Sequence, residues 1–276
     1  MTLQQQQDFE IIRDLIWEKS GIYFENTKRQ YCLRRLQNRM ILRGCRGLKE
    51  YYHILQYESS GAELSELLNL LTTTETYFFR NTPQLRSFQE EILPDILRRK
   101  QQNGEAHLHF WSAGCSSGEE AYTIAMLLLE TLPENHAWKI SIAGTDINTD
   151  VLIKAREAVY SGRALRDTPE TYIHKYFQKE GDLYRLSDRV KNMVRFRKGN
   201  LIQSDDASLL QSLDCIFCRN VLIYFNLESC RQVIEIFYNN LARHGYLLLG
   251  HSESLYRITA IFALKKLQHS LVYYKE

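Results

Sequence analysis

The sequence predicts an α/β fold in which a mostly parallel sheet ends in an antiparallel strand and follows an all-helical domain. Residues 1–80 show apolar residues at helical spacing and no strand pattern. From residue 107 onward, short apolar runs alternate with helical segments, which is typical of a parallel sheet covered by helices. Residues 262–268 and 270–274 have the pattern of two strands with almost no connection, and so tight a hairpin is antiparallel.

The composition is that of a globular protein with room for about two domains. The chain has 276 residues, of which 44% are hydrophobic and 25% charged, enough apolar material for a sizeable core. It contains no apolar run long enough to span a membrane, and its start, residues 1–8, lacks a signal-peptide pattern. We therefore expect a cytoplasmic protein. The net charge of +2 argues against bulk nucleic-acid coating, which needs a strong basic excess.

Residues 1–82 are expected to form a helical N-terminal domain. Phe9, Ile12 and Ile16 are spaced by three and four residues, and similar spacing recurs along residues 33–40 and 64–71. A further helix is expected after Pro83, over roughly residues 84–102. We assign residues 83–276 to a second domain, with residues 83–103 as a linker helix and residues 163–198 as a small inserted β-subdomain.

The second domain alternates strands with helices. Strands are expected at residues 107–111, 140–144, 214–224 and 245–250, and helices at residues 119–130, 148–159 and 227–243. The alternation breaks between Gly162 and Lys198. There we expect a short helix and a small strand pair formed by residues 182–186 and 193–196.

The cysteines and histidines do not indicate a metal site. Six cysteines in a core-rich chain without an export signal are expected to be reduced. Cys215 and Cys218 spell C-x-x-C, but residues three apart in a strand point to opposite faces, so a metal or redox pair is disfavoured. His107 and His109 share a strand face with no clear third ligand, so we expect no metal.

A turn of small residues, 114–118, follows the first strand and leads into a helix that begins with Glu119 and Glu120. Small residues let a ligand approach the backbone, and a helix start offers free N–H groups. Two acids there would repel a pyrophosphate, so a dinucleotide is disfavoured. S-adenosylmethionine fits better, because it has a sulfonium, an ammonium and no phosphate. The alternative is a helix whose N-terminal acids only stabilise it.

Polar residues also follow the next strands. Asp146 ends the second strand, where doubly wound folds place an acid that binds ribose hydroxyls; the alternative is a cap for the next helix. Asn200 follows the strand-like residues 194–197 and either reads an adenine edge or only serves a turn.

Two further segments carry candidate residues. Arg219 and Asn220 interrupt the apolar run that begins at Asp214, and Tyr224 either presents its hydroxyl to a reacting centre or only packs its ring. Residues 72–80 combine polar residues with two phenylalanines and an arginine, so the segment either folds over a ligand or is a capped interdomain linker.

Taken together, these segments resemble the chemotaxis receptor methyltransferase family, CheR. The resemblance spans nearly the whole chain and is carried by residues 73–81, 111–121, 144–148, 217–225 and 249–253. It implies the S-adenosylmethionine-dependent methyltransferase fold. It also implies methyl transfer from S-adenosylmethionine to glutamate side chains of chemoreceptors, giving glutamyl methyl esters for sensory adaptation.

Carried over residue by residue, the resemblance implies a cofactor site and two catalytic residues. Glu120, chosen over Glu119 by alignment alone, would hold the amino-acid moiety. Many relatives have Asn where this chain has Thr74, which weakens Thr74 as a ligand. The implied catalytic residues are Arg80 and Tyr224, nearest the methyl group and the incoming carboxylate. The implied cofactor-binding residues are Thr74, Thr76, Arg80, Gly114, Glu120, Asp146 (ribose), Asn200 and Leu201 (adenine), Asn220 and Val221.

The N-terminal domain carries a basic segment. Residues 28–46 include seven basic residues and no acid, and Arg35, Arg39, Arg43 and Arg46 are spaced as one helical stripe. The stripe is either a solvated face or a docking surface for an acidic partner. The resemblance favours docking to the cytoplasmic helical region of a chemoreceptor. We expect no nucleic-acid partner, because interleaved aromatics are lacking, no membrane insertion, and a monomer.

Two other classes of function are weighed against this interpretation. A signalling module that binds without catalysis is disfavoured by the presence of Arg80, Asp146, Asn220 and Tyr224. A nicotinamide-dependent oxidoreductase is disfavoured by the acids at the first helix start and by the terminal hairpin. The short segment between Phe177 and Leu183 argues against binding a peptide tether from the receptor tail.

Overall fold

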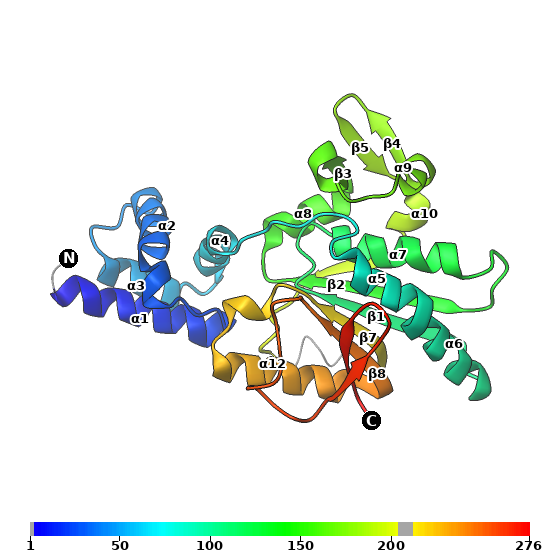
Figure 1. Cartoon of the computed structure of the whole chain (residues 1–276). Coiled ribbons are helices and arrows are strands. Elements are labelled where there is room, and N and C mark those ends of the chain that lie inside the picture. The colour runs from blue at the N-terminus through cyan, green and yellow to red at the C-terminus, as the bar shows by residue number, and fades with distance from the viewer. Residues whose placement is uncertain (1–2, 204–211) are drawn as a thin grey trace.

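The computed structural model describes residues 3–203 and 212–276 and shows a bundle of helices beside a central sheet (Figure 1). The bundle consists of α1 (Leu3–Ser20), α2 (Arg29–Leu42), α3 (Leu48–Tyr57) and α4 (Ala62–Leu71). Ile12, Leu36, Tyr51 and Leu67 are fully buried in its core. The helical nature predicted for this part of the chain is confirmed.

The linker helix contains one irregular turn. It consists of α5 (Thr82–Ser87), a π-helical segment (Phe88–Ile92) and α6 (Leu93–Gln102). Pro94 has no N–H to donate to the carbonyl of Glu90, so the regular helical ladder is interrupted there and the backbone widens just before it.

The central sheet has the order β6-β2-β1-β7-β8-β10-β9. Strands β6, β2, β1, β7 and β8 run parallel, and β10 runs antiparallel to both of its neighbours. The predicted mostly parallel α/β sheet with an antiparallel last strand is therefore confirmed. The bounds are β1 (His107–Ala113), β2 (Lys139–Asp146), β6 (Val194–Lys198), β7 (Leu213–Cys218), β8 (Leu241–Leu249), β9 (Ala263–Lys266) and β10 (Leu271–Tyr274).

Helices cover both faces of the sheet. α7 (Glu119–Thr131) packs on one face and α12 (Leu227–Asn240) on the other (Figure 1). In β7 the side chains alternate between the core beneath α7 and the core beneath α12. Cys215 packs in the core beneath α7, and Cys218 packs in the core beneath α12. The opposite orientation predicted for these two residues is confirmed, and all six cysteines, each in the described ranges, are free thiols.

Several predicted element bounds are wrong, and three of them have a clear cause in the backbone. β7 ends at Cys218 rather than at residue 224, because Asn220 takes a left-handed conformation (φ 61°) and turns the chain. α12 ends at Asn240 rather than at residue 243, because Leu241 is extended and starts the pairing of β8 with β7. α8 (Thr149–Glu157) ends before the left-handed Ala158, and Val159 begins a strand.

The small inserted sheet has three antiparallel strands, β3 (Val159–Ser161), β5 (Leu183–Leu186) and β4 (Phe177–Glu180). It is accompanied by α9 (Glu170–Tyr176) and α10 (Asp188–Lys191). The expectation that residues 193–196 belong to it is wrong, because Val194–Lys198 is the edge strand β6 of the large sheet. Phe196 fits there because Gly118 and Gly144 have no side chain; a Cβ on Gly144 would lie 2.6 Å from its ring. The domain division at residue 82 stays a prediction.

The basic stripe predicted in the N-terminal domain is not one free helix face. Arg39 forms an ion pair with Glu63 of α4 (Nη2–Oε2 2.6 Å), and Glu63 also accepts a hydrogen bond from Tyr51 (2.6 Å). Arg46 lies beyond the end of α2, so it does not continue the stripe. Arg43 forms an ion pair with Glu58. The spacing predicted an outward face, but Arg39 is paired within the domain. The sequence pattern does not reveal this pair, because Glu63 lies 24 residues away along the chain.

No helix in residues 3–203 or 212–276 combines the length and apolarity needed to cross a membrane.

The Arg39–Glu63 pair predicts a stability effect. Burial raises the pKa of the Glu63 carboxyl, but the hydrogen bonds from Arg39 and Tyr51 outweigh it and hold the pKa below its usual value. Arg39→Met leaves Glu63, 1% exposed, without its main partner. We expect the free energy of unfolding at neutral pH to fall by about 3 kcal/mol, measured by urea unfolding. The difference should shrink on acidification, because a lowered pKa contributes stability that is lost as pH falls through it.

The matched control is Arg86→Met, since Arg86 forms an exposed ion pair with Glu90. That change should lower the free energy of unfolding by less than about 0.5 kcal/mol. Equal effects of the two substitutions would contradict the prediction.

Candidate functional site

A cavity of about 290 Å³ lies at the carboxyl ends of β1, β2, β6 and β7. Ligands of open α/β sheets bind at this edge, and the volume is near the lower end of the range for small-molecule sites. The linker after α4 and the end of α1 also line the cavity. Every residue predicted for the site lines it: Thr74, Thr76, Arg80, Gly114, Glu120, Asp146, Asn200, Leu201, Asn220, Val221 and Tyr224.

The loop after β1 is shaped by Gly114. Gly114 has a φ of 77°, and a Cβ on it would lie 2.4 Å from Cγ2 of Val221, so no larger residue fits without moving the opposite wall. The N–H groups of Gly114 and Cys115 both donate to the carbonyl of Thr145. These two hydrogen bonds fix the loop to the end of β2, and the loop residues 114–116 line the cavity.

Asp146 faces the cavity with its carboxylate already oriented. Its Oδ2 accepts from the N–H of Ser116 (2.8 Å) and its Oδ1 from the N–H of Asn148 (2.9 Å). Burial raises the pKa of Asp146, although these backbone N–H groups act against the shift. Asn148, not Asp146, caps α8, by accepting from the N–H groups of Asp150 and Val151. Asp146 is thus available to accept hydroxyl donors from a ligand.

Glu120 and Glu119 point to different places. The Oε1 of Glu120 accepts from Ser112 (2.7 Å) and its Oε2 pairs with Nη1 of Arg219 (3.2 Å) at the cavity wall. Glu119 is bound instead by Ser117 and does not line the cavity. Burial raises the pKa of Glu119 to about 7 and also raises the pKa of Glu120. Of the two adjacent acids, Glu120 is therefore the one placed to contact a ligand.

Arg219 connects three parts of the site. Its guanidinium, 4% exposed, donates to Glu120 of α7 and to the main-chain carbonyl of Arg80 in the linker. The sequence marked Arg219 only as a polar interruption, yet a buried arginine requires a carboxylate partner. An arginine within an apolar run could therefore have been recognised from the sequence as the partner of a buried acid in the site.

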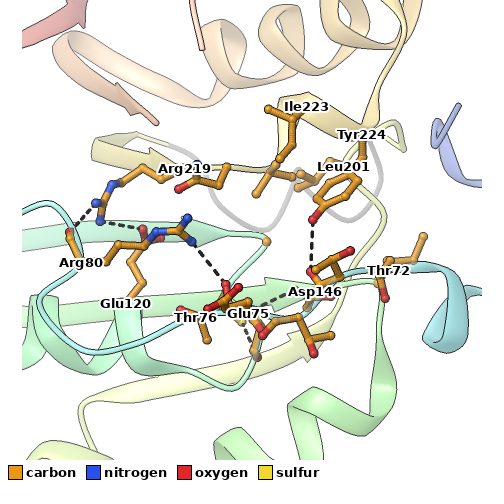
Figure 2. Close-up of a pocket in the computed structure, with 18 of the residues that line it drawn as sticks. Thr72, Glu75, Thr76, Arg80, Glu120, Asp146, Leu201, Arg219, Ile223 and Tyr224 are labelled. Atoms are coloured by element: carbon orange, nitrogen blue, oxygen red, sulfur yellow. Dashed lines mark hydrogen bonds and ion pairs between the residues drawn. The ribbon is translucent and has the colours of Figure 1, made fainter. Parts of the chain in front are cut away.

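Arg80 lies in the linker between two left-handed residues, Phe79 and Asn81. Its Nη1 donates to the carbonyl of Glu75 (3.3 Å), and its guanidinium carbon lies 5.6 Å from the ring centre of Tyr77. Figure 2 shows Arg80, Glu120 and Arg219 at one end of the cavity and Asp146, Leu201 and Tyr224 at the other. The segment predicted to fold over a ligand does form a wall of the cavity.

The N-terminal domain completes the site, a contribution that the sequence did not reveal. Ser20, the last residue of α1, and Ile22, two residues later, line the cavity. The N–H of Tyr23 donates to the carbonyl of Tyr224 (2.9 Å), and the Asn200 amide donates to the carbonyl of Lys19 (2.7 Å).

The donor set fits S-adenosylmethionine better than a nucleotide phosphate. One end of the cavity offers a carboxylate and a guanidinium, which suit an ammonium and a carboxylate, and the other end offers Asp146 for hydroxyls. A phosphate would lie against two partly buried acids, Glu120 and Asp146. The described residues contain no group of three or more His, Cys, Asp or Glu side chains that could hold a metal ion.

Comparisons with known proteins give the family. The model for the all-alpha domain of CheR methyltransferases matches residues 7–72, and the model for their S-adenosylmethionine-binding domain matches residues 74–271. Chemotaxis protein methyltransferase 2 of Vibrio cholerae is 42% identical, over 97% of this chain and 92% of that protein. The chemotaxis protein methyltransferase of Escherichia coli is 33% identical, over 93% and 87%, and that of Borreliella burgdorferi is 33% identical, over 87% and 86%. The chain belongs to the CheR methyltransferase family.

Proposed function

We propose that this chain transfers a methyl group from S-adenosylmethionine to glutamate side chains in the cytoplasmic helical region of a chemoreceptor, forming glutamyl methyl esters. The observation that carries the proposal is the cavity at the sheet edge, which joins the Glu120–Arg219 pair at one end to Asp146 at the other. This arrangement of charges suits a zwitterionic amino acid attached to a nucleoside.

Residues at both ends of the cavity would hold the cofactor. Glu120 would accept from the ammonium, with Arg219 beside it for the carboxylate. Asp146 would accept from the ribose hydroxyls, and Asn200 and Leu201 would line the adenine. Thr74, Thr76, Gly114, Asn220 and Val221 would complete the walls.

The chemistry asks the protein for placement rather than for a base. The bound sulfonium supplies a reactive methyl group with a good leaving group. A glutamate acceptor has a pKa of about 4.3 and is ionised near neutral pH, so no proton must be removed; none of the described residues lining the cavity is a histidine. Arg80 would orient the incoming carboxylate through its planar fork, and Tyr224 would border the reacting groups. Holding two reactants in line and excluding water is worth roughly 7–11 kcal/mol.

The C-terminal end of α2 would contribute to receptor docking. Arg43 and Arg46 are exposed there, beside the exposed apolar side chains of Ile41 (77%) and Leu42 (72%). Apolar residues rimmed by positive charge suit an acidic amphipathic helix. Arg39 is excluded from this role by its pairing with Glu63. Arg35 donates a hydrogen bond to the carbonyl of Leu70, so it would contribute to docking only through its positive charge. The monomeric state stays a prediction.

Methyl transfer from radiolabelled S-adenosylmethionine to a receptor fragment tests the proposed function. Base treatment should release the label as methanol, because glutamyl methyl esters are base-labile. A thermal-shift comparison should show stabilisation by S-adenosylhomocysteine and none by NAD. Absence of label, or label that resists base, would contradict the proposal.

Arg80→Ala should lower methyl transfer by about 100-fold, because the acceptor carboxylate loses its bidentate partner. Initial rates of label incorporation measure the effect. Arg86→Ala, on the exposed side of α5, is the matched control and should leave the rate unchanged. Near-normal turnover of Arg80→Ala would refute the role of Arg80.

Asp146→Ala should weaken binding of S-adenosylhomocysteine by roughly 10- to 100-fold, since the ribose loses a charged acceptor. Calorimetry gives the dissociation constant directly. Asp150→Ala, at an exposed position of α8, is the control. An affinity equal to that of the wild type would rule out the contact.

Arg46→Glu should raise the KM for the receptor fragment by about three-fold, with a larger effect at low salt, because an exposed charge facing an acidic partner is screened by ions. Affinity for S-adenosylhomocysteine should not change. The control is Arg98→Glu on α6, away from α2 in Figure 1. The docking surface would be misplaced if both variants behaved alike.

A further inference from the structure

The turn that ends β7 is held from behind by a carboxylate outside the cavity. Glu253, in the loop that follows β8, accepts from three backbone N–H groups. Its Oε2 accepts from Asn220 (2.8 Å) and Gly250 (2.6 Å), and its Oε1 accepts from Val221 (2.9 Å). Asn220 and Val221 line the cavity, whereas Glu253 does not.

The turn offers its backbone N–H groups to such a partner because of its conformation. Asn220 has a φ of 61°, and Val221 returns to the right-handed region. Left-handed backbone costs most residues with a side chain roughly 1–2 kcal/mol, and Asn tolerates it better than most. Successive N–H groups in such a turn point to one side and form a concave anion site. Here the anion is the Glu253 carboxylate, and hydrogen bonds to an ionised acceptor are about twice as strong as neutral ones.

Glycines on both sides leave the turn little room to move. A Cβ on Gly250 would lie 2.7 Å from Oε2 of Glu253 and 2.9 Å from the backbone nitrogen of Asn220. On the cavity side, a Cβ on Gly114 would lie 2.4 Å from Val221. The turn is therefore packed between the loop after β1 and the loop after β8.

The residues on either side of the turn are those that the proposed mechanism uses. Arg219 comes directly before it and reaches Glu120 and the carbonyl of Arg80. Tyr224 comes three residues after it, in a short 3-10 helix (Leu222–Tyr224). Displacing the turn would move both side chains together with the cavity wall.

We propose that Glu253 is a positioning residue for methyl transfer, whose carboxylate fixes the turn at Asn220 and Val221 and thereby sets the shape of the cofactor cavity. This inference rests on the proposed function. Residues 249–253 belong to the family resemblance but do not line the cavity. The inference gives Glu253, one of these residues, a role.

The test compares Glu253→Ala and the isosteric Glu253→Gln with Glu235→Ala and Glu235→Gln, at an exposed position of α12. Calorimetry with S-adenosylhomocysteine gives both the dissociation constant and the number of sites per chain, and kinetics with a receptor fragment give KM and kcat. We expect the dissociation constant and the KM for S-adenosylmethionine to rise by about ten-fold in Glu253→Ala. The number of sites should stay at that of the wild type, the KM for the receptor fragment should not change, and Glu253→Gln should be milder.

A merely structural role gives a different result. Partial unfolding would lower the number of sites and the apparent kcat while leaving the dissociation constant of the folded fraction unchanged. That outcome, or wild-type values for both Glu253 variants, would overturn the inference. If the wild-type chain itself failed to bind S-adenosylhomocysteine or to methylate the receptor fragment, the proposed function would fall first.

Gly250→Ala gives an independent second measurement, since it disturbs the same turn and keeps the carboxylate. It should reproduce the rise in the dissociation constant seen with Glu253→Ala. Gly47→Ala is the control, because a Cβ there would meet nothing within 4 Å. An unchanged affinity in Gly250→Ala would also overturn the inference.

Discussion

The buried pair of Arg219 and Glu120 is the interaction on which the site depends. It joins the turn after β7 to the first turn of α7, and the same guanidinium reaches the main chain of the linker at Arg80. Three segments distant in the sequence therefore meet at one charged contact. A buried ion pair stabilises a fold only weakly, but removing one partner is costly. The contact therefore does more to fix the relative positions of these segments than to stabilise the protein.

The helical domain contributes to the same geometry from outside the sheet. The end of α1 binds the carbonyl of Tyr224 through the Tyr23 N–H, and α4 meets the start of α8 through hydrogen bonds between Asn69 and Thr149. The linker that follows Asn69 is held at its other end by the hydrogen bond from Arg219 to the carbonyl of Arg80, so residues 72–80 stay in the wall of the cavity. One domain thereby supplies a wall of the cofactor cavity and also presents the exposed end of α2.

The sheet was predicted from local sequence patterns, and the residues around the cavity were predicted partly from these patterns and partly from the family resemblance. Carboxyl ends of parallel strands converge, so Gly114, Asp146 and Asn220 had to lie near one another once the strands were recognised. What failed were features set by distant partners. Arg39 has the spacing of an outward stripe, but Glu63 of another helix pairs with it. Residues 193–196 have an ordinary strand pattern that does not say which sheet they join. They pair with the large sheet, where the ring of Phe196 fills the space beside Gly144. Ser20 and Ile22 carry no local sign of a site.

The charge distribution of the cavity also explains why a related fold is put to a different use. Dinucleotide sites at this edge leave a helix start free of acids, so that N–H groups and the helix dipole can face a pyrophosphate. Here Glu120 occupies that place and Asp146 lies nearby, both partly buried in the cavity wall, so a phosphate would meet negative charge. Arg219 offsets part of the charge of Glu120, whereas Asp146 accepts its hydrogen bonds from backbone N–H groups, so the negative charge that a phosphate would meet is chiefly that of Asp146. A ligand whose positive centre faces Glu120 is attracted instead of repelled. The carboxylate is already in place, so the cavity does not have to reorganise for this contact. The preference for a sulfonium-bearing nucleoside over a dinucleotide follows from where these two carboxylates lie in the cavity wall rather than from the shape of the sheet.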